Sequence, residues 1–213
     1  MSNRADQKVW TIVVAGGSGQ RFGRPKQYEL VGSQRVLDLS VAVARAVSDG
    51  VVVVVPAADS VSERAVAGGA TRSESVRCGL AQVPQDATIV CVHDAARPFA
   101  SIQLYESVIA AICDGADGAI PGIGVSDTIK VVAEGGAVIA TPERSSLRAV
   151  QTPQAFRAAI LRSAHASGGE GTDDAALVES LGGSVIVVAG EVDNRKITHP
   201  EDLDWARAMV GAA

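Results

Sequence analysis

Short apolar runs alternate with longer segments of helical periodicity along most of this chain. The first run, Val9–Ala15, is closed by Gly16-Gly17, and the second, Val51–Val55, is five valines stopped by Pro56. Strands this apolar are typical of a parallel sheet that is covered on both faces. Alternation of strands and helices implies right-handed crossovers between parallel strands. We therefore expect an α/β fold, a Rossmann-like, mostly parallel twisted sheet with helices on both faces.

The remaining elements follow from the same patterns. Further buried strands are predicted over Thr88–His93, Gly118–Pro121 and Val185–Ala189, and helices over Val36–Val47, Ser73–Ala81, Ile102–Cys113, Phe156–Ala166, Asp173–Leu181 and Pro200–Val210. A length of 213 residues suits one domain over residues 1–213. Hydrophobic residues make up 47% of the chain but aromatic residues only 3%, so the core must be mainly aliphatic.

One stretch breaks the alternation. Asp127–Val132 alternates polar and apolar residues, a turn follows at Glu134-Gly135-Gly136, and Ala137–Thr141 alternates again. This pattern predicts a β-hairpin, with glycine supplying the positive φ angles of a tight turn. No predicted helix covers it, so we expect a protruding arm over residues 125–148. A second copy of the chain would cover its apolar face most simply, which predicts a homodimer.

Charge and cysteine usage limit the surroundings and the partners of the chain. The net charge is -5, which argues against a broad nucleic-acid surface but permits a small anion in a local basic pocket. The first apolar run is too short for a signal peptide or a membrane span. Cys78, Cys91 and Cys113 are odd in number and lack metal-site spacing. We expect reduced core thiols in a cytoplasmic protein.

The glycine loop after the first strand, Ala15–Gly23, is a candidate phosphate site. Glycines let the backbone approach a ligand and direct several N–H groups at one point. The loop lacks the G-K-[ST] ending of a P-loop, and the third glycine of a dinucleotide motif beginning at Gly17 is replaced by Phe22. Arg21 and Lys26 add two cations, so we expect this loop to hold a triphosphate.

The third predicted strand ends in His93-Asp94-Ala95-Ala96-Arg97-Pro98. Residues at the carboxyl ends of parallel strands line the ligand crevice. Asp94 is a candidate Mg²⁺ ligand, with a helix N-cap as the alternative, and Arg97 is a candidate partner for a phosphate. For His93 we expect a structural role, as a hydrogen-bonded side chain at the strand end.

Taken in order, these motifs resemble the 2-C-methyl-D-erythritol 4-phosphate cytidylyltransferases of the non-mevalonate route to isoprenoids, over nearly the whole chain. The matching segments are Ala15–Gly23, Pro25-Lys26-Gln27, Gly68-Gly69-x-x-Arg72-x-x-Ser75-Val76, His93–Pro98, Asp127-Thr128-Ile129-Lys130, Arg144, Thr152-Pro153-Gln154, Thr172-Asp173 and Asp193–Thr198. Ala70 departs from the family, whose members often carry a polar or acidic residue there.

The resemblance implies CTP and a sugar-alcohol phosphate as substrates, Mg²⁺ as cofactor, and a dimer whose arm reaches the neighbouring subunit. It implies roles for residues in three groups. The catalytic cations are Arg21, Lys26 and Lys196; the nucleotide is held by Ala15, Gly16, Gly17, Ser18, Gly19, Gly69, Ser75 and Asp94; and the sugar phosphate is bound by Arg97, Thr128, Arg144 and Thr152. Asp94 would also hold the metal.

Three other functions compete with this one. A ribitol 5-phosphate cytidylyltransferase shares the glycine loop and the His-Asp run, and Ala96 favours the erythritol enzymes. An NAD-dependent dehydrogenase is disfavoured by Phe22 and by the missing acidic residue after Val55. A non-catalytic nucleotide-binding module would need fewer charges than Arg21, Lys26, Asp94 and Lys196 provide.

Overall fold

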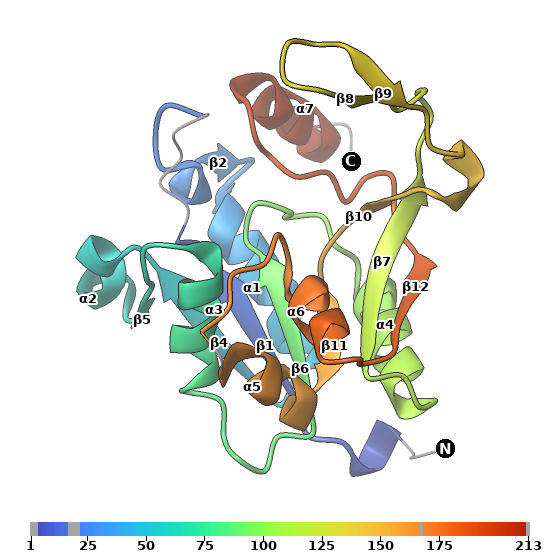
Figure 1. The fold of residues 1–213 in the computed structure, drawn as a ribbon. Coiled ribbons are helices and arrows are strands. Elements are labelled where there is room, and N and C mark those ends of the chain that lie inside the picture. The colour runs from blue at the N-terminus through green and yellow to red at the C-terminus, as the bar shows by residue number, and fades with distance from the viewer. Residues whose placement is uncertain (1–3, 17–21, 167, 212–213) are drawn as a thin grey trace.

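A central sheet of eight strands organises the molecule (Figure 1). The structure, a computed structural model, describes residues 4–16, 22–166 and 168–211. The strands are β1 (Val9–Val14), β4 (Gly50–Val55), β5 (Val66–Ala67), β6 (Ile89–Asp94), β7 (Gly118–Gly124), β10 (Arg148–Val150), β11 (Gln154–Arg157) and β12 (Val185–Ala189). They run in the order β10-β7-β11-β6-β1-β4-β5, with β12 on β7. The pairs of β1 with β4 and β6, of β4 with β5, and of β7 with β12 are parallel.

Helices cover both faces of this sheet, as the alternation predicts. On one face lie α1 (Val36–Val47) and α4 (Ile102–Cys113), and on the other α3 (Arg72–Leu80), α5 (Ala158–Ala166) and α6 (Asp174–Ser180). Alternate residues of β1 serve the two sides: Val9 and Val13 pack with α1 and α4, and Ile12 packs with α3 and α5. The expected mostly parallel sheet with two helical layers is confirmed.

A third, smaller apolar cluster lies beyond the carboxyl edge of the sheet. It joins α7 (Pro200–Gly211) to the segment that holds the short elements η2 (Lys26–Tyr28), β2 (Leu30–Val31) and β3 (Gln34–Arg35). Its buried members are Phe22, Val31, Val36, Ile197, Leu203 and Ala206. This cluster therefore packs the chain after the glycine loop against the chain around residue 197.

The predicted hairpin is present and protrudes from the domain (Figure 1). Among the described strands, β8 (Val131–Val132) pairs with β9 (Val138–Ala140) alone, and both are exposed along their whole length. Gly135 and Gly136 take φ angles of 97° and 87° in the turn, which glycine adopts without steric cost. The strands are shorter than predicted, because one register shift interrupts their pairing. The short helix η4 (Arg144–Ser146) ends the arm, and η1 (Arg4–Asp6), η3 (Ala57–Asp59) and α2 (Ser60–Glu63) complete the fold.

Two predictions about elements were wrong. β12 is not a buried strand: Ile186 is 42% and Val187 50% exposed, because β12 lies at the margin of the sheet, where β7 is its one partner among the described strands. The helix predicted from Phe156 begins at Ala158, since Gln154–Arg157 forms β11, an antiparallel strand between β6 and β7. β10 was also not predicted. Strands of three or four residues are too short to show a period of two in the sequence.

The cysteines are free, as expected, although only Cys91 is fully buried and the other two are half-buried. Burial raises the pKa of the Cys91 thiol to about 12, which makes it unreactive at neutral pH. In the described part of the chain, none of the helices has the length and apolar character needed to cross a membrane.

Candidate active site

The two motifs that follow β1 and β6 lie side by side at the carboxyl edge of the sheet. Val14 is in register with Asp94, and the Ala95 amide donates a hydrogen bond of 3.0 Å to the carbonyl of Val14. The start of the glycine loop and the His-Asp run therefore open onto the same edge. This is the edge at which parallel α/β sheets bind ligands.

Asp94 is the centre of a cluster of charges drawn from three distant segments. The Lys196 ammonium donates to Oδ2 at 2.6 Å, and Arg72 Nε donates to Oδ1 at 3.2 Å. Arg72 opens α3, and Lys196 follows β12 by seven residues. Burial alone would raise the pKa of the Asp94 carboxyl, but the positive charges of Arg72 and Lys196 hold it well below its usual value. Asp94 is therefore a permanent anion, and the N-cap alternative is excluded because α4 begins only at Ile102 behind Ser101.

His93 and Thr152 hold the backbone of Asp94 and Arg97 in place through hydrogen bonds. The Thr152 hydroxyl accepts from the Asp94 amide at 3.0 Å and donates to His93 Nδ1 at 3.1 Å, while His93 Nε2 donates to the Arg97 carbonyl at 3.1 Å. Burial lowers the pKa of His93 to about 4, so the ring is neutral at pH 7. His93 has the structural role that the sequence predicts, and Thr152 lies beside Asp94 with its hydroxyl already engaged.

Arg97 holds two neighbouring loops together. Its Nη1 donates to the Asn194 carbonyl at 2.8 Å and its Nη2 to the Val150 carbonyl at 3.3 Å. Its buried Nε has no hydrogen-bond partner among the described residues. Burial lowers the pKa of Arg97. The structure thus places Arg97 next to the segment that carries Lys196. Its guanidinium donates to two neutral carbonyl groups, so its positive charge is available to a bound anion.

Three glycines and Ser75 form a close backbone cradle beside the cluster. A Cβ atom would lie 3.0 Å from Ser75 Oγ at Gly16, and 2.8 Å from the same atom at Gly68. At Gly69 it would lie 2.3 Å from Glu74 Cβ, so a side chain does not fit there either. The predicted nucleotide residues Ala15, Gly16, Gly69 and Ser75 therefore meet in space. Gly17, Ser18, Gly19 and Arg21 lie outside the described residues.

Lys26 comes from the segment that the third apolar cluster packs against the Lys196 segment. It opens η2, four residues after Phe22, and Phe22 shares that cluster with Ile197, the neighbour of Lys196. The Ile197 amide in turn donates to the Ala96 carbonyl at 2.8 Å. The two predicted lysines thus belong to segments that are packed together at the edge of the sheet that carries Asp94.

The arm residues are not part of this cluster within one chain. Thr128 is exposed, and Arg144 is exposed with its Nη1 donating to the Ser126 carbonyl of the same arm at 2.8 Å. Their predicted role in binding the sugar phosphate therefore depends on a second copy of the chain.

Sequence reasoning gave no role to three residues behind Asp94, of which Asp174 and His165 are buried and Arg72 is partly exposed. Arg72 was part of a quoted motif without a function, and Asp174 and His165 were not considered. The sequence did contain an indication for Arg72. An arginine in the first turn of a helix lies near the positive end of the helix dipole, which is unfavourable for a cation unless a carboxylate lies nearby. No comparable signal exists for Asp174 or His165, whose pairing depends on the packing of α5 against α6.

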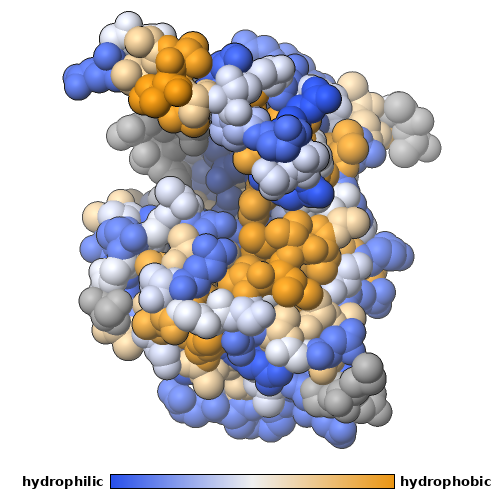
Figure 2. Space-filling view, turned by 45° about the vertical axis from the view of Figure 1, so that its right-hand side comes forward, coloured by the Kyte–Doolittle hydropathy of each residue, from blue (hydrophilic) through white to orange (hydrophobic). Residues whose placement is uncertain are grey.

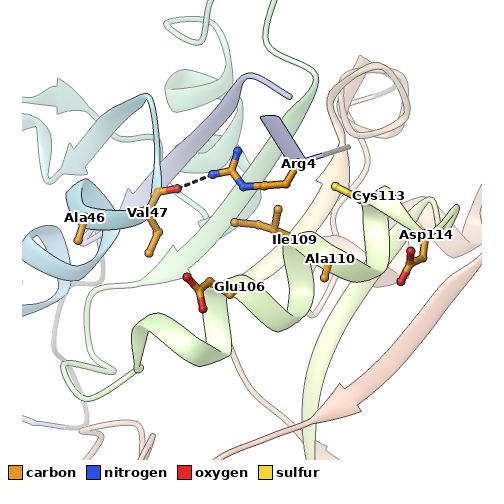
Figure 3. Close-up of a pocket in the computed structure, with 8 residues that line it drawn as sticks. All are labelled: Arg4, Ala46, Val47, Glu106, Ile109, Ala110, Cys113 and Asp114. Carbon is orange, nitrogen blue, oxygen red and sulfur yellow. Dashed lines mark hydrogen bonds between the residues drawn. The ribbon is translucent and has the colours of Figure 1, made fainter. Parts of the chain in front are cut away.

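A cavity of about 420 Å³ lies at the opposite edge of the sheet (Figure 3). It is bordered by Arg4, which precedes β1, by the end of α1 and by α4, and Arg4 Nη2 donates to the Val47 carbonyl at 2.9 Å. None of the residues that line it belongs to the predicted site.

Comparison with known proteins agrees with this geometry. The family model described as IspD, 2-C-methyl-D-erythritol 4-phosphate cytidylyltransferase, matches residues 9–212. The enzyme of that name from Rhodococcus jostii is 46% identical over 95% of this chain and 95% of its own length. A bifunctional IspD/IspF enzyme from Anaeromyxobacter dehalogenans is 44% identical over 97% of this chain and 58% of its own.

Solved structures give the same result. The crystal structure of the cytidylyltransferase from Thermus thermophilus superposes with a TM-score of 0.79 at 36% identity, over 94% of this chain and 98% of that one. The chain spans only 36% to 58% of the length of the bifunctional relatives it matches. A match of this extent to one family model excludes the dehydrogenase alternative. The chain belongs to the 2-C-methyl-D-erythritol 4-phosphate cytidylyltransferase family.

Proposed function

We propose that this chain transfers a cytidylyl group from CTP to 2-C-methyl-D-erythritol 4-phosphate and releases pyrophosphate, as a step of non-mevalonate isoprenoid synthesis in the cytoplasm. The observation that carries the proposal is the contact of Lys196 with Asp94, which joins two family motifs that lie 102 residues apart at the carboxyl edge of the sheet. The matched family model and relatives favour methylerythritol phosphate over ribitol phosphate. A buried free thiol at Cys91 fits a reducing compartment.

The chemistry needs positive charge more than it needs a general base. A phosphate monoester has a second pKa of about 6, so the acceptor is largely dianionic at neutral pH and is itself the nucleophile. Its oxygen forms a bond to the α-phosphorus as the bond from that phosphorus to the bridging oxygen of pyrophosphate breaks. The barrier is repulsion between anions, which Lys26, Lys196 and Arg21 would reduce by charge stabilisation at the α-phosphorus.

We propose Mg²⁺ as the cofactor, held by Asp94. The described residues contain no group of three or more His, Cys, Asp or Glu side chains able to bind a metal on their own. One hard carboxylate beside a triphosphate site is sufficient for Mg²⁺, which takes its other ligands from phosphate oxygens and water. Asp94 is ionised and already attracts two cations, so its donor chemistry fits. The ion would supply charge neutralisation on the triphosphate.

We propose a homodimer formed through the arm. Side chains exposed on the arm and β12 include Val132 at 55%, Ile139 at 66% and Val187 at 50%. Figure 2 shows apolar residues gathered both on the protruding hairpin and on the body below it. Exposed apolar area of this kind is typical of an interface. In such a dimer, Thr128 and Arg144 of one protomer would reach the site of its partner.

The test is one assay of the pure protein with CTP, Mg²⁺ and each candidate sugar phosphate. We expect pyrophosphate release with 2-C-methyl-D-erythritol 4-phosphate and little with ribitol 5-phosphate. Preference for ribitol 5-phosphate would overturn the proposed substrate, and no pyrophosphate release with either sugar phosphate would overturn the proposed function. Chiral α-phosphorothioate CTP gives a second readout: inversion supports in-line displacement, whereas retention indicates a covalent enzyme intermediate.

A further inference from the structure

The buried carboxylate of Asp174 lies behind the Asp94 cluster and has no surface accessible to a ligand. Asp174, the first residue of α6, is fully buried. Its Oδ1 pairs with His165 Nε2 at 3.1 Å, and its Oδ2 lies 2.8 Å from Arg72 Nη2, as an ion pair. A charge at this depth is costly unless it is paired, so Asp174 has a reason to be there beyond packing.

Arg72 connects Asp174 to the site. Its Nη2 faces Asp174 and its Nε donates to Asp94 Oδ1 at 3.2 Å, so one planar guanidinium is held between two carboxylates. Its Nη1 is buried and has no hydrogen-bond partner within the described chain. One hydrogen bond to Asp94 and one ion pair to Asp174 together restrain the guanidinium, whereas a single contact would leave it freer to rotate.

The two cations on Asp94 differ in freedom. Arg72 is anchored at both ends, and its side chain is 26% exposed. Lys196 reaches Asp94 on a flexible stem, and its side chain is 37% exposed. If a nucleotide brought phosphates and a divalent cation, Lys196 would therefore leave Oδ2 more easily than Arg72 would leave Oδ1.

We propose that Asp174 is a positioning residue that holds Arg72 on a single oxygen of Asp94 and so keeps the other oxygen available to a divalent cation. Arg72, Lys196, Asp94 and Asp174 together carry no net charge. Without Asp174, Asp94 would be the remaining carboxylate partner of Arg72, and the guanidinium would compete with the metal for both oxygens of Asp94. The inference rests on the proposed function, since it assumes a metal-nucleotide complex at Asp94.

The test compares Mn²⁺ binding, measured by electron paramagnetic resonance in the presence of α,β-methylene CTP, in the wild-type protein and in Asp174→Asn. We expect binding to be about tenfold weaker in the variant, the lower end for loss of a group behind a metal ligand. The Mg²⁺ concentration for half-maximal turnover should rise by the same factor, while kcat at saturating Mg²⁺ stays within about threefold. Wild-type Mn²⁺ affinity in Asp174→Asn would overturn the proposal.

Two further variants separate positioning from a general loss of structure. Asp173→Asn removes a charge one residue away, keeps a side chain able to cap α6 at Ala176, and leaves Arg72 paired, so Mn²⁺ binding should not change. If Asp174 acts only by restraining Arg72, the double variant Arg72→Gln/Asp174→Asn should bind Mn²⁺ within about threefold of wild type. That variant leaves no unpaired buried charge in the pair, so it remains informative if Asp174→Asn alone fails to fold.

The outcomes also separate this proposal from the proposed function. Tenfold weaker binding in the double variant would show that Asp174 acts by some other route. If the wild-type protein binds no Mn²⁺ with the nucleotide analogue, the metal-nucleotide site itself is wrong. Normal wild-type binding that Asp174→Asn leaves unchanged would remove only the positioning role.

Discussion

The Asp94 cluster and the hairpin arm differ in how their candidate functional residues are held in place. At the cluster, Asp94 is 8% exposed and each of its carboxylate oxygens is engaged by a cation from another part of the same chain. On the arm, Ile139 is 66% exposed, and the Arg144 side chain donates to the backbone of its own arm, at the Ser126 carbonyl. The cluster is assembled from described residues of a single chain, whereas the role proposed for the arm needs a partner.

This difference separates two kinds of binding residue. Residues at the carboxyl edge are positioned by strands whose register the core fixes, as with Val14 and Asp94. Residues on the arm lack such support within the described chain, because β8 and β9 there pair with each other alone and an isolated two-stranded hairpin is marginally stable in water. These differences support the proposal that one chain binds the nucleotide and that two chains share the sugar-phosphate site.

The largest effect is expected at Lys26. Replacement by alanine should lower kcat by ~10²–10³-fold, because it removes a fixed charge that stabilises the transition state. Steady-state pyrophosphate release measures this. The matched control is Lys8→Ala at the far edge of the sheet, whose exposed ion pair with Asp86 should contribute little. Normal turnover in Lys26→Ala would make Lys26 a surface charge.

Breaking the proposed dimer should give the next largest effect. Ile139→Asp places a charge on the exposed apolar face of β9, which a partner would have to bury unpaired. We expect a monomer by light scattering and a raised KM for the sugar phosphate, with CTP affinity unchanged. A dimer of normal activity would place the interface elsewhere. Val61→Asp, at a residue 88% exposed on α2, is the control and should change neither property.

Arg144→Ala sharpens the comparison without disturbing the interface. Loss of one charged hydrogen-bond donor to a phosphate is worth about 1.5–3 kcal/mol, or roughly a tenfold or larger rise in KM for the sugar phosphate. The dissociation constant of CTP, from calorimetry, should not change. An unaltered KM would remove Arg144 from the site. Arg157→Ala, which loses only an exposed pair with Asp117, is the matched arginine control.

The last prediction concerns the pH dependence of stability and not catalysis. Burial lowers the pKa of His93 to about 4, whereas the unfolded chain has a value near 6.5. The unfolded state therefore binds the proton first, and the free energy of unfolding should fall as pH drops from about 6.5 to about 4, by up to ~3 kcal/mol. Chemical denaturation across this range measures it. His93→Gln should lose this component, and a variant with the wild-type pH dependence would contradict the assignment.

Much of the fold and part of the site could be predicted from the sequence. Runs such as Val51–Val55 and the helix Ile102–Cys113 are long enough to show their period, and both lie where they were expected. The position of Asp94 followed from the rule that parallel strands present their carboxyl ends to ligands. The lone pairing of β12 did not follow, because an apolar run looks the same whether a helix or a second protein chain covers it.

What the sequence could not supply is side-chain pairing across long separations. Arg72 and Asp174 lie 102 residues apart and meet only after α3 and α6 have packed on the same face of the sheet. Neither composition nor residue spacing indicates which distant side chains will pair. The family resemblance did not supply it either, since it named Arg72 in a motif without indicating what the guanidinium contacts.

The most direct test of the shared site mixes two impaired variants and assays them at a sugar-phosphate concentration well below the wild-type KM. Lys26→Ala lacks a charge in the body, and Arg144→Ala lacks a charge on the arm. If the arm serves the neighbouring subunit, a mixed dimer has one site with both defects and one site with neither. Mixing equal amounts with free subunit exchange should therefore restore about a quarter of the wild-type activity, because half of the dimers are mixed and each has one intact site. Activity no higher than the average of the two variants would show that each chain completes its own site, and would contradict the account.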